Sequence, residues 1–235
     1  IKEFQKYSSK LKELTQNLLD MKKNSSLISS IKEIKKLNLL LSNDKFLDIS
    51  KLVKICKTHG TLPFSIIARH AFIAESFLIS LKENKCINYK RLISFRSSLK
   101  TITSELINDT NKLVQNETSF RSFLKKYGHL RPSTYDINSK SYKEQNLKNF
   151  IQKKIKLKKI KPFKLKKSEK IKINTIIKKN NLNIKSEDLI DYISLSIKNR
   201  ENAKFVFTKC INRIFKQIKY FSKLKKIKRN YLDLL

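Results

Sequence analysis

Residues that interrupt helices are almost absent from this chain, which has two Gly and three Pro among 235 residues. Glycine and proline are the strongest breakers of a helix interior, so their scarcity predicts long uninterrupted helices. Alternating apolar and polar residues bounded by turns, which would predict strands, do not occur outside one lysine-rich segment. We therefore predict an all-α fold: a multi-helix bundle with one long functional loop and a C-terminal helical hairpin.

Apolar residues recur with helical periodicity along most of the sequence. Start signals accompany the pattern: Ser25 and Ser26 precede one apolar run, and Ser186 is followed by two acidic residues, which suit the positive end of a helix dipole. The predicted helices cover residues 2–22, 26–41, 45–58, 64–83, 88–115, 117–127, 143–156, 168–180 and 186–222.

The first predicted break in this pattern lies at residues 58–64. Gly60 can end a helix in the left-handed conformation, and Pro63 can open the next helix. We predict a short structural turn at this point.

The second predicted break is a long loop at residues 127–142, with the sequence YGHLRPSTYDINSKSY. Long loops within compact helical domains are usually functional. Gly128 and Pro132 are its expected structural residues.

Lysine is concentrated between Lys153 and Lys172, where eleven Lys accompany one acidic residue, Glu169, and one proline, Pro162. The alternating stretch IKLKKIKPFKLKK is compatible with a strand, but self-repelling charge and the proline favour an exposed linker. The predicted organisation is a helical body at 1–150, a lysine-rich linker at 151–167 and a C-terminal helical hairpin at 168–235.

The formal net charge of +35 indicates an anionic partner, and nucleic acid is one alternative. Of the 54 basic residues, however, 46 are Lys and eight are Arg. Proteins that read nucleic acids use Arg for base contacts and aromatic residues for stacking, and neither is enriched here. Nucleic-acid binding through the lysine-rich segment and the last helix therefore stays the alternative function.

No apolar run reaches the roughly 18 residues that span a bilayer, and no signal-peptide pattern is present, so we expect a cytoplasmic location without membrane contact. The chain opens at Ile1, and we expect a fragment or a processed chain. Cys56, Cys86 and Cys210 are far apart in sequence and form no metal-binding pattern with the histidines, so we predict buried free thiols and no metal site.

The segment 64–83 is apolar on nearly every face, which predicts a central buried helix. Arg69 and His70 lie within it. Burying an Arg is costly unless it is paired or meets an anion, so Arg69 either bridges to a carboxylate or points into a ligand site. For His70 we favour a hydrogen-bonded core residue.

The loop gathers His129, Arg131, Thr134 and Asp136 within eight residues. Arg captures phosphate or carboxylate with two hydrogen bonds, and His exchanges a proton near neutral pH, so the set suits an anionic ligand. The alternative is a structural loop in which Arg131 and Asp136 pair with each other or with helix ends. No glycine-rich phosphate loop and no nucleophile with its base can be recognised, so no residue of this chain is predicted to be catalytic.

The string FLKKYGHLRPSTYDINSKSY resembles the "YGHLRPGTYDI…SPRY" loop of phosphoenolpyruvate-synthase-like phosphotransferases, which are related to pyruvate phosphate dikinase. The stretches GTLPFSIIARHAFIAESFLISL and NRENAKFVFTKCINRIF agree with the same family in the same order, the latter with "REYAKFEFTRNLSDAL". The three matches cover about a third of the chain.

In that family an ATP-grasp domain phosphorylates a histidine on a mobile domain, which hands the phosphoryl group to an acceptor, with Mg and positioning carrying most of the catalysis. This chain shows neither the ATP-grasp half nor the phosphohistidine motif. The resemblance therefore implies the helical middle region between those domains, which in some relatives helps to form the acceptor site. ATP and Mg belong to the implied full-length enzyme, and this chain alone is expected to bind no cofactor.

The resemblance maps ligand-site roles onto Arg69, His129, Arg131, Thr134 and Asp136. The acceptor stays open: pyruvate, an antibiotic-like molecule and a surface-polysaccharide precursor are all compatible. Ser133 stands where the family often has Gly, and if that position needs positive φ, the loop is expected to be distorted.

Overall fold

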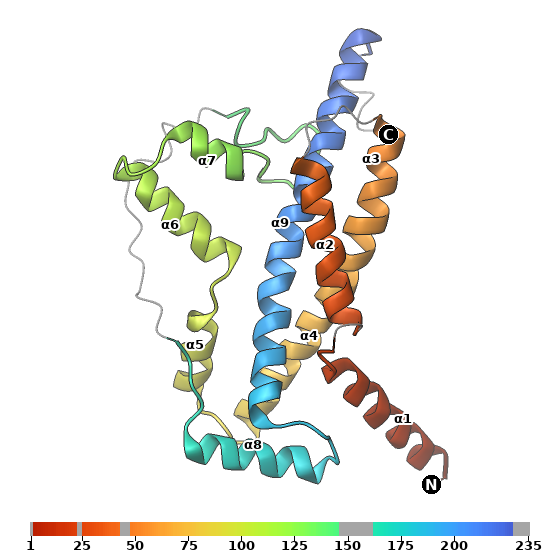
Figure 1. The fold of residues 1–235 in the computed structure, drawn as a ribbon, viewed down its shortest axis with the longest axis vertical. Helices are drawn as coiled ribbons and strands as arrows, with labels where there is room; N and C mark the ends of the chain where they lie inside the picture. The colour runs from red at the N-terminus through yellow and green to blue at the C-terminus, as the bar shows by residue number, and fades with distance from the viewer. Residues whose placement is uncertain (1, 23–24, 43–47, 146–161, 228–235) are drawn as a thin grey trace. The chain divides into compact units, whose positions relative to one another are not determined.

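The computed structural model describes residues 2–22, 25–42, 48–145 and 162–227. Every regular element in these ranges is a helix, which confirms the all-α prediction (Figure 1). The elements are α1 (Lys2–Leu19), α2 (Ser26–Ser42), α3 (Ile49–Ile55), the π-helical turn η1 (Cys56–Thr61), α4 (Leu62–Glu83), α5 (Tyr89–Ser98), α6 (Ile102–Val114), α7 (Phe120–Tyr127), α8 (Lys167–Lys179) and α9 (Ser186–Leu224).

Two compact units make up the chain, and each draws on three separate segments. Unit 1 consists of Ile1–Lys32, Ser65–Lys100 and Lys159–Arg200, and unit 2 consists of Glu33–Phe64, Thr101–Lys158 and Glu201–Leu235. The predicted boundaries at 150 and 167 flank a stretch that lies mostly outside the described residues, so that division stays a prediction. Helices α8 and α9 follow one another where a C-terminal pair of helices was predicted.

The predicted turn at residues 58–64 is wrong, because the chain stays helical from Ile49 to Glu83. Gly60 lies in the π-helical turn η1, and no glycine in the described residues has positive φ. At the end of η1 the backbone hydrogen bond spans five residues instead of the four of an α-helix: the Leu62 N–H donates to the Lys57 carbonyl. This wider turn ends at Thr61, one residue short of Pro63, whose missing N–H and bulky ring would otherwise break an α-helix.

The continuous helix Ile49–Glu83 is long and apolar enough, by length and composition, to cross a membrane. The sequence prediction missed this because it divided the segment at the expected turn. Core helices of soluble proteins have the same length and composition, so the cytoplasmic location stays a prediction.

The predicted helix 88–115 is two helices, α5 and α6. Thr101 ends the interruption between them, because its hydroxyl accepts from Ser104 N while its own N–H donates to Ser104 Oγ. Such a reciprocal capping box starts a helix without any Gly or Pro. Residues 142–145, at the start of the predicted helix 143–156, form turns and a bend, and the rest of that helix lies outside the described residues.

The core of unit 1 contains His70, which is buried on α4. Its Nε2 lies 2.9 Å from Ser26 Oγ, and its Nδ1 lies 2.9 Å from the Tyr192 hydroxyl. Burial and then the Arg69 charge lower the pKa of His70. The prediction of a hydrogen-bonded core histidine is confirmed.

The core of unit 2 forms around the second half of α9. Gly60 lies against Phe207, which stacks on Phe64 with ring centroids 5.6 Å apart. The thiols of Cys56 and Cys210 are buried, and Cys210 Sγ donates to the Leu52 carbonyl at 3.9 Å. All three cysteines are buried and free, as predicted.

Candidate functional site

The long loop begins where α7 ends, at Gly128, and has no helix or strand up to residue 142, as predicted; residues 143–145, where a helix was predicted, continue it. Two backbone hydrogen bonds close it on itself: Tyr142 N donates to the Leu130 carbonyl at 2.7 Å, and Lys143 N donates to the Gly128 carbonyl at 3.0 Å. Gly128 fits here because a Cβ would lie 2.3 Å from the Leu124 carbonyl oxygen. The loop therefore has a fixed base on unit 2.

Arg131 is the buried centre of the loop. Its Nη1 donates to the backbone carbonyls of Asp136 at 3.2 Å and Ser139 at 3.1 Å, and its Nη2 donates to the side-chain oxygen of Asn212 on α9. The guanidinium carbon also lies 5.0 Å from the centroid of the Phe215 ring. Arg131 thus links two parts of the loop backbone to each other and to α9.

Asp136 has a smaller role than predicted, because its side chain is exposed and caps the loop backbone by accepting from Asn138 N at 2.8 Å. Arg131 bonds the Asp136 carbonyl oxygen, so the structural alternative holds in a modified form: Arg131 pairs with the loop backbone and with Asn212.

His129 packs against Phe205 of α9, with ring centroids 4.6 Å apart in an edge-to-face arrangement. Its Nε2–H donates to the Phe205 carbonyl at 3.1 Å. Burial, followed by the nearby Lys209 charge, lowers the pKa of His129 to about 4. The imidazole is therefore neutral near pH 7, with Nε2 carrying the proton.

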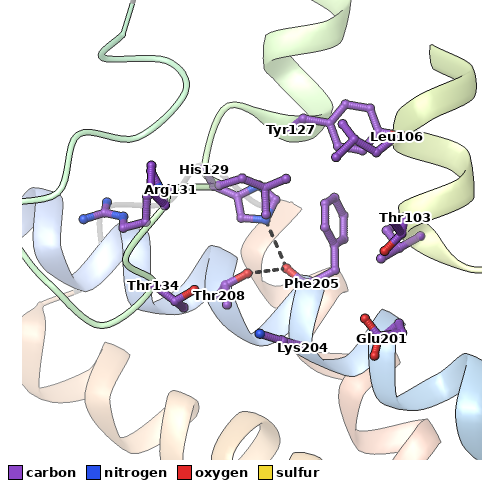
Figure 2. A pocket seen from close by; sticks show the side chains of 13 residues that line it. Thr103, Leu106, Tyr127, His129, Arg131, Thr134, Glu201, Lys204, Phe205 and Thr208 are labelled. Carbon is purple, nitrogen blue, oxygen red and sulfur yellow. Dashed lines mark hydrogen bonds between the residues drawn. The ribbon is translucent and has the colours of Figure 1, made fainter. Parts of the chain in front are cut away.

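A cavity of about 290 Å³ opens between the loop, α6 and α9 within unit 2. Figure 2 shows the side chains that surround it, and the dashed lines mark the bonds that His129 and Thr208 both donate to the Phe205 carbonyl. The lining residues are Ile102, Thr103, Leu106, Tyr127, His129, Leu130, Arg131, Pro132, Thr134, Glu201, Lys204, Phe205 and Thr208.

The wall of the cavity is held in place by a polar network on α6 and α7. The buried Tyr127 donates its hydroxyl to Asp109 at 2.8 Å, and Lys126 Nζ lies 2.8 Å from the same carboxylate oxygen. Burial raises the pKa of Tyr127 to about 12. Burial alone would raise the pKa of Asp109 as well, but the bonds from Lys126 and Tyr127 outweigh it and lower that pKa.

The structure brings three predicted ligand residues, His129, Arg131 and Thr134, to one cavity, together with Pro132. It does not include Asp136, Gly60, Pro63 or Arg69 among the lining residues. Arg69 lies on the unit 1 part of α4 and is exposed, so the prediction of a buried arginine is wrong. The helix is less buried than its apolar sequence indicated, as the exposed Phe72 also shows.

Ser133 does not have positive φ, so the condition under which a distorted loop was expected is not met. The four described non-glycine residues with positive φ are Lys85, Asn116, Asn181 and Lys226. Serine therefore carries no left-handed strain at this position.

Sequence reasoning missed the contribution of α9 to the cavity: Glu201, Lys204, Phe205 and Thr208. The stretch NRENAKFVFTKCINRIF, which contains all four, was part of the family resemblance, but nothing in its spacing assigned these residues a role. Among the described residues, no group of three His, Cys, Asp or Glu side chains is placed to hold a metal ion.

Comparisons with protein-family models, with curated proteins and with solved structures find no match to this chain. The resemblance to phosphoenolpyruvate-synthase-like enzymes therefore depends on the three sequence stretches alone.

Proposed function

We propose that this chain is the internal helical connector of a phosphoenolpyruvate-synthase-like phosphotransferase and that the cavity beside the loop is its acceptor site. The observation that carries the proposal is that three residues chosen from sequence, His129, Arg131 and Thr134, line one cavity with a lysine of α9. In the proposed parent enzyme, flanking domains bind ATP and Mg and carry the phosphohistidine. This chain supplies binding groups and no catalytic residue.

Lys204 is the group best suited to attract an anionic acceptor or its phosphoryl group. It is exposed at the cavity, and Figure 2 draws it with the side chains of Thr134 and Thr208 around the same space. An ammonium and neighbouring hydroxyls can together donate several hydrogen bonds to phosphate or carboxylate oxygens.

Arg131 acts as a positioning residue in this proposal. Its guanidinium already donates to two loop carbonyls and to Asn212, so it shapes the cavity by holding the loop. His129 similarly contributes a neutral ring, and with Phe205 it forms an aromatic wall.

The cavity lies at the small end of the range for ligand sites, roughly 300 to 1,000 Å³. A small acceptor such as a 2-oxo acid fits that size better than a polymer. The nucleic-acid alternative gains no support here, because most of the predicted lysine-rich linker at 151–167 lies outside the described residues.

The experiment separates the two half-reactions in the full-length protein that contains this chain. Incubation with ATP labelled at the β-phosphate should give an acid-labile, histidine-bound label, and a chase with pyruvate as probe acceptor should discharge it. Lys204→Ala should slow the discharge by on the order of tenfold or more, the effect of losing one charged contact, and leave labelling unchanged.

Lys54→Ala is the matched control, since Lys54 is an exposed lysine of α3 that does not line the cavity. Parent-like discharge in Lys204→Ala would remove the cavity from the transfer step. Failure of the parent protein to form a phosphohistidine would contradict the family assignment itself.

A further inference from the structure

Unit 2 has a second cavity, of about 500 Å³, on the other part of the loop and the end of α9. It shares no lining residue with the first cavity. Its lining residues are Asn138, Lys140, Glu144, Lys216, Lys219, Tyr220, Ser222, Lys223 and Ile227.

Three lysines of this cavity share one face of α9. Lys216, Lys219 and Lys223 are spaced by three and four residues, which places them one above the other on a helix. At 1.5 Å rise per residue, the seven steps from Lys216 to Lys223 extend over about 10 Å. Lys140 adds a fourth ammonium from the loop.

One carboxylate lines the cavity, that of Glu144, and the protein already uses it. Its Oε2 accepts from Ser141 N at 2.7 Å and from Ser141 Oγ at 2.6 Å, while Oε1 lies 3.6 Å from Lys219 Nζ. Burial alone would raise the pKa of Glu144, but these bonds and the nearby cations lower it to about 2. Glu144 is therefore ionised, and its charge acts on Lys219, Lys216 and Arg131 as well as on the loop.

Among the described residues, no carboxylate lies within ion-pairing distance of Lys140, Lys216 or Lys223, so Glu144 offsets the charge of Lys216 only from a longer distance. Desolvation and then the charge of Lys143 lower the pKa of Lys216; the Glu144 charge acts in the opposite direction, and Arg131 and Arg213 add further repulsion. Like charges gathered at one cavity repel one another, and a bound anion would relieve that repulsion.

We propose that this second cavity binds the polyphosphate group of a small ligand. An isolated surface lysine gives no such indication, but here four ammonium groups line one concave surface of the size that small ligands occupy. The lysine row is about 10 Å long, which exceeds a single phosphate and suits a chain of two or three phosphates. Lysine binds phosphate as a mobile point charge, so we expect this cavity to select a ligand by its density of negative charge more than by its shape.

The test uses the full chain and inorganic tripolyphosphate as probe, with binding measured by isothermal titration calorimetry at about 0.1 M salt, where surface charges more than about 10 Å apart are screened. The double variant Lys216→Gln with Lys223→Gln should weaken binding by on the order of tenfold or more. The matched control is Lys54→Gln with Lys57→Gln, which removes the same charge from exposed positions outside both cavities. The control should bind as the parent does.

Two further probes distinguish the sources of the phosphate. ATP should compete with tripolyphosphate for the same site, whereas a single-stranded oligo(dT) that binds more tightly than both would assign the surface to nucleic acid and overturn the proposal. Equal weakening in the two double variants would show attraction by net charge alone and would also overturn it. No binding of tripolyphosphate at millimolar concentration has the same consequence.

Tripolyphosphate binding that Lys204→Ala weakens and that the double variant Lys216→Gln with Lys223→Gln leaves unchanged would place the anion in the first cavity and overturn the proposal. Failure of this proposal is therefore distinguishable from failure of the acceptor-site proposal.

Discussion

Arg131 donates a hydrogen bond through Nη2 to the side-chain oxygen of Asn212, and this bond joins the centre of the long loop to α9. Both residues are buried, at 9% and 6% exposure. Because α9 also supplies Lys204 and Thr208, the contact fixes the geometry between the two halves of the first cavity.

Arg131→Ala should lower the free energy of unfolding by about 2 to 4 kcal/mol, because the Asp136 and Ser139 carbonyls and Asn212 would lose a charged donor. Asn212→Ala should cost less, since Arg131 keeps its two carbonyl partners. Urea unfolding of both single variants and the double variant gives the coupling, expected at about 1 kcal/mol or more. Additive effects would show that the bond contributes nothing.

Gly128→Ala should destabilise unit 2 more than Gly60→Ala. A Cβ at position 128 would lie 2.3 Å from a backbone oxygen of Leu124, which cannot move without opening the end of α7. At position 60 the nearest atoms, 2.9 and 3.2 Å away, belong to the side chains of Phe207 and Leu37. We expect a loss of about 2 kcal/mol or more for Gly128→Ala and about 1 kcal/mol for Gly60→Ala, measured as urea midpoints. The reverse order would contradict the geometry of the loop base.

His129 makes stability depend on pH between its unfolded and folded pKa values. The folded pKa is lowered from 6.5 to about 4, so the unfolded chain binds more protons in that window, and the free energy of unfolding must fall as the pH falls from 6.5 toward 4. The slope approaches about 1.4 kcal/mol per pH unit well inside the window.

His129→Gln keeps an N–H donor for the Phe205 carbonyl and removes the titration. The free energy of unfolding of the variant should therefore fall less between pH 7 and pH 5 than that of the parent, and the remaining fall should equal the contribution of other groups, among them His70, whose pKa is also lowered. Parallel stability curves for parent and variant over this range would show that His129 titrates normally in the folded protein.

Glu169→Ala should destabilise unit 1 by about 3 kcal/mol, as expected for breaking a buried ion pair by removing one partner. Glu169 is buried and accepts from Arg91 Nε at 2.7 Å and from Arg91 Nη2 at 2.8 Å, while the Arg91 guanidinium lies 4.2 Å from the Phe163 ring centroid. Glu75→Ala is the control, because its bond to Arg96 lies on the surface and should contribute below about 1 kcal/mol. Thermal unfolding of the two variants makes the comparison.

The helical class was predictable because it follows from local properties: the lack of breakers and the apolar periodicity of segments such as α9. The positions of interruptions were less predictable. Thr101 starts α6 through a capping box with Ser104, although no Gly or Pro marks the start of that helix in the sequence. Gly60 lies inside a π-helical turn that runs directly into α4, the helix that contains Pro63.

The loop side of the candidate site could be predicted from the sequence, but the α9 side could not. His129, Arg131 and Thr134 stood out because they gather polar chemistry in one loop, but the α9 residues that complete the cavity are about 70 positions away in the chain, and only folding brings them there. The prediction that Arg69 is buried was wrong for a related reason, because the sequence of an apolar helix does not show which of its faces pack against other elements. Glu169 is the one acidic residue between Lys153 and Lys172. In the sequence it was counted only as part of a charged linker, whereas in the structure it is buried and paired with Arg91.

The most direct test of the acceptor-site proposal is a titration of the full chain with phosphoenolpyruvate, a small phosphate and carboxylate carrier, followed by amide chemical shifts in NMR spectra. The account predicts saturable shifts at Thr134, Lys204 and Thr208, lost in Lys204→Ala and kept in Lys54→Ala. Saturable shifts that avoid these three residues, or none at millimolar phosphoenolpyruvate, would contradict it.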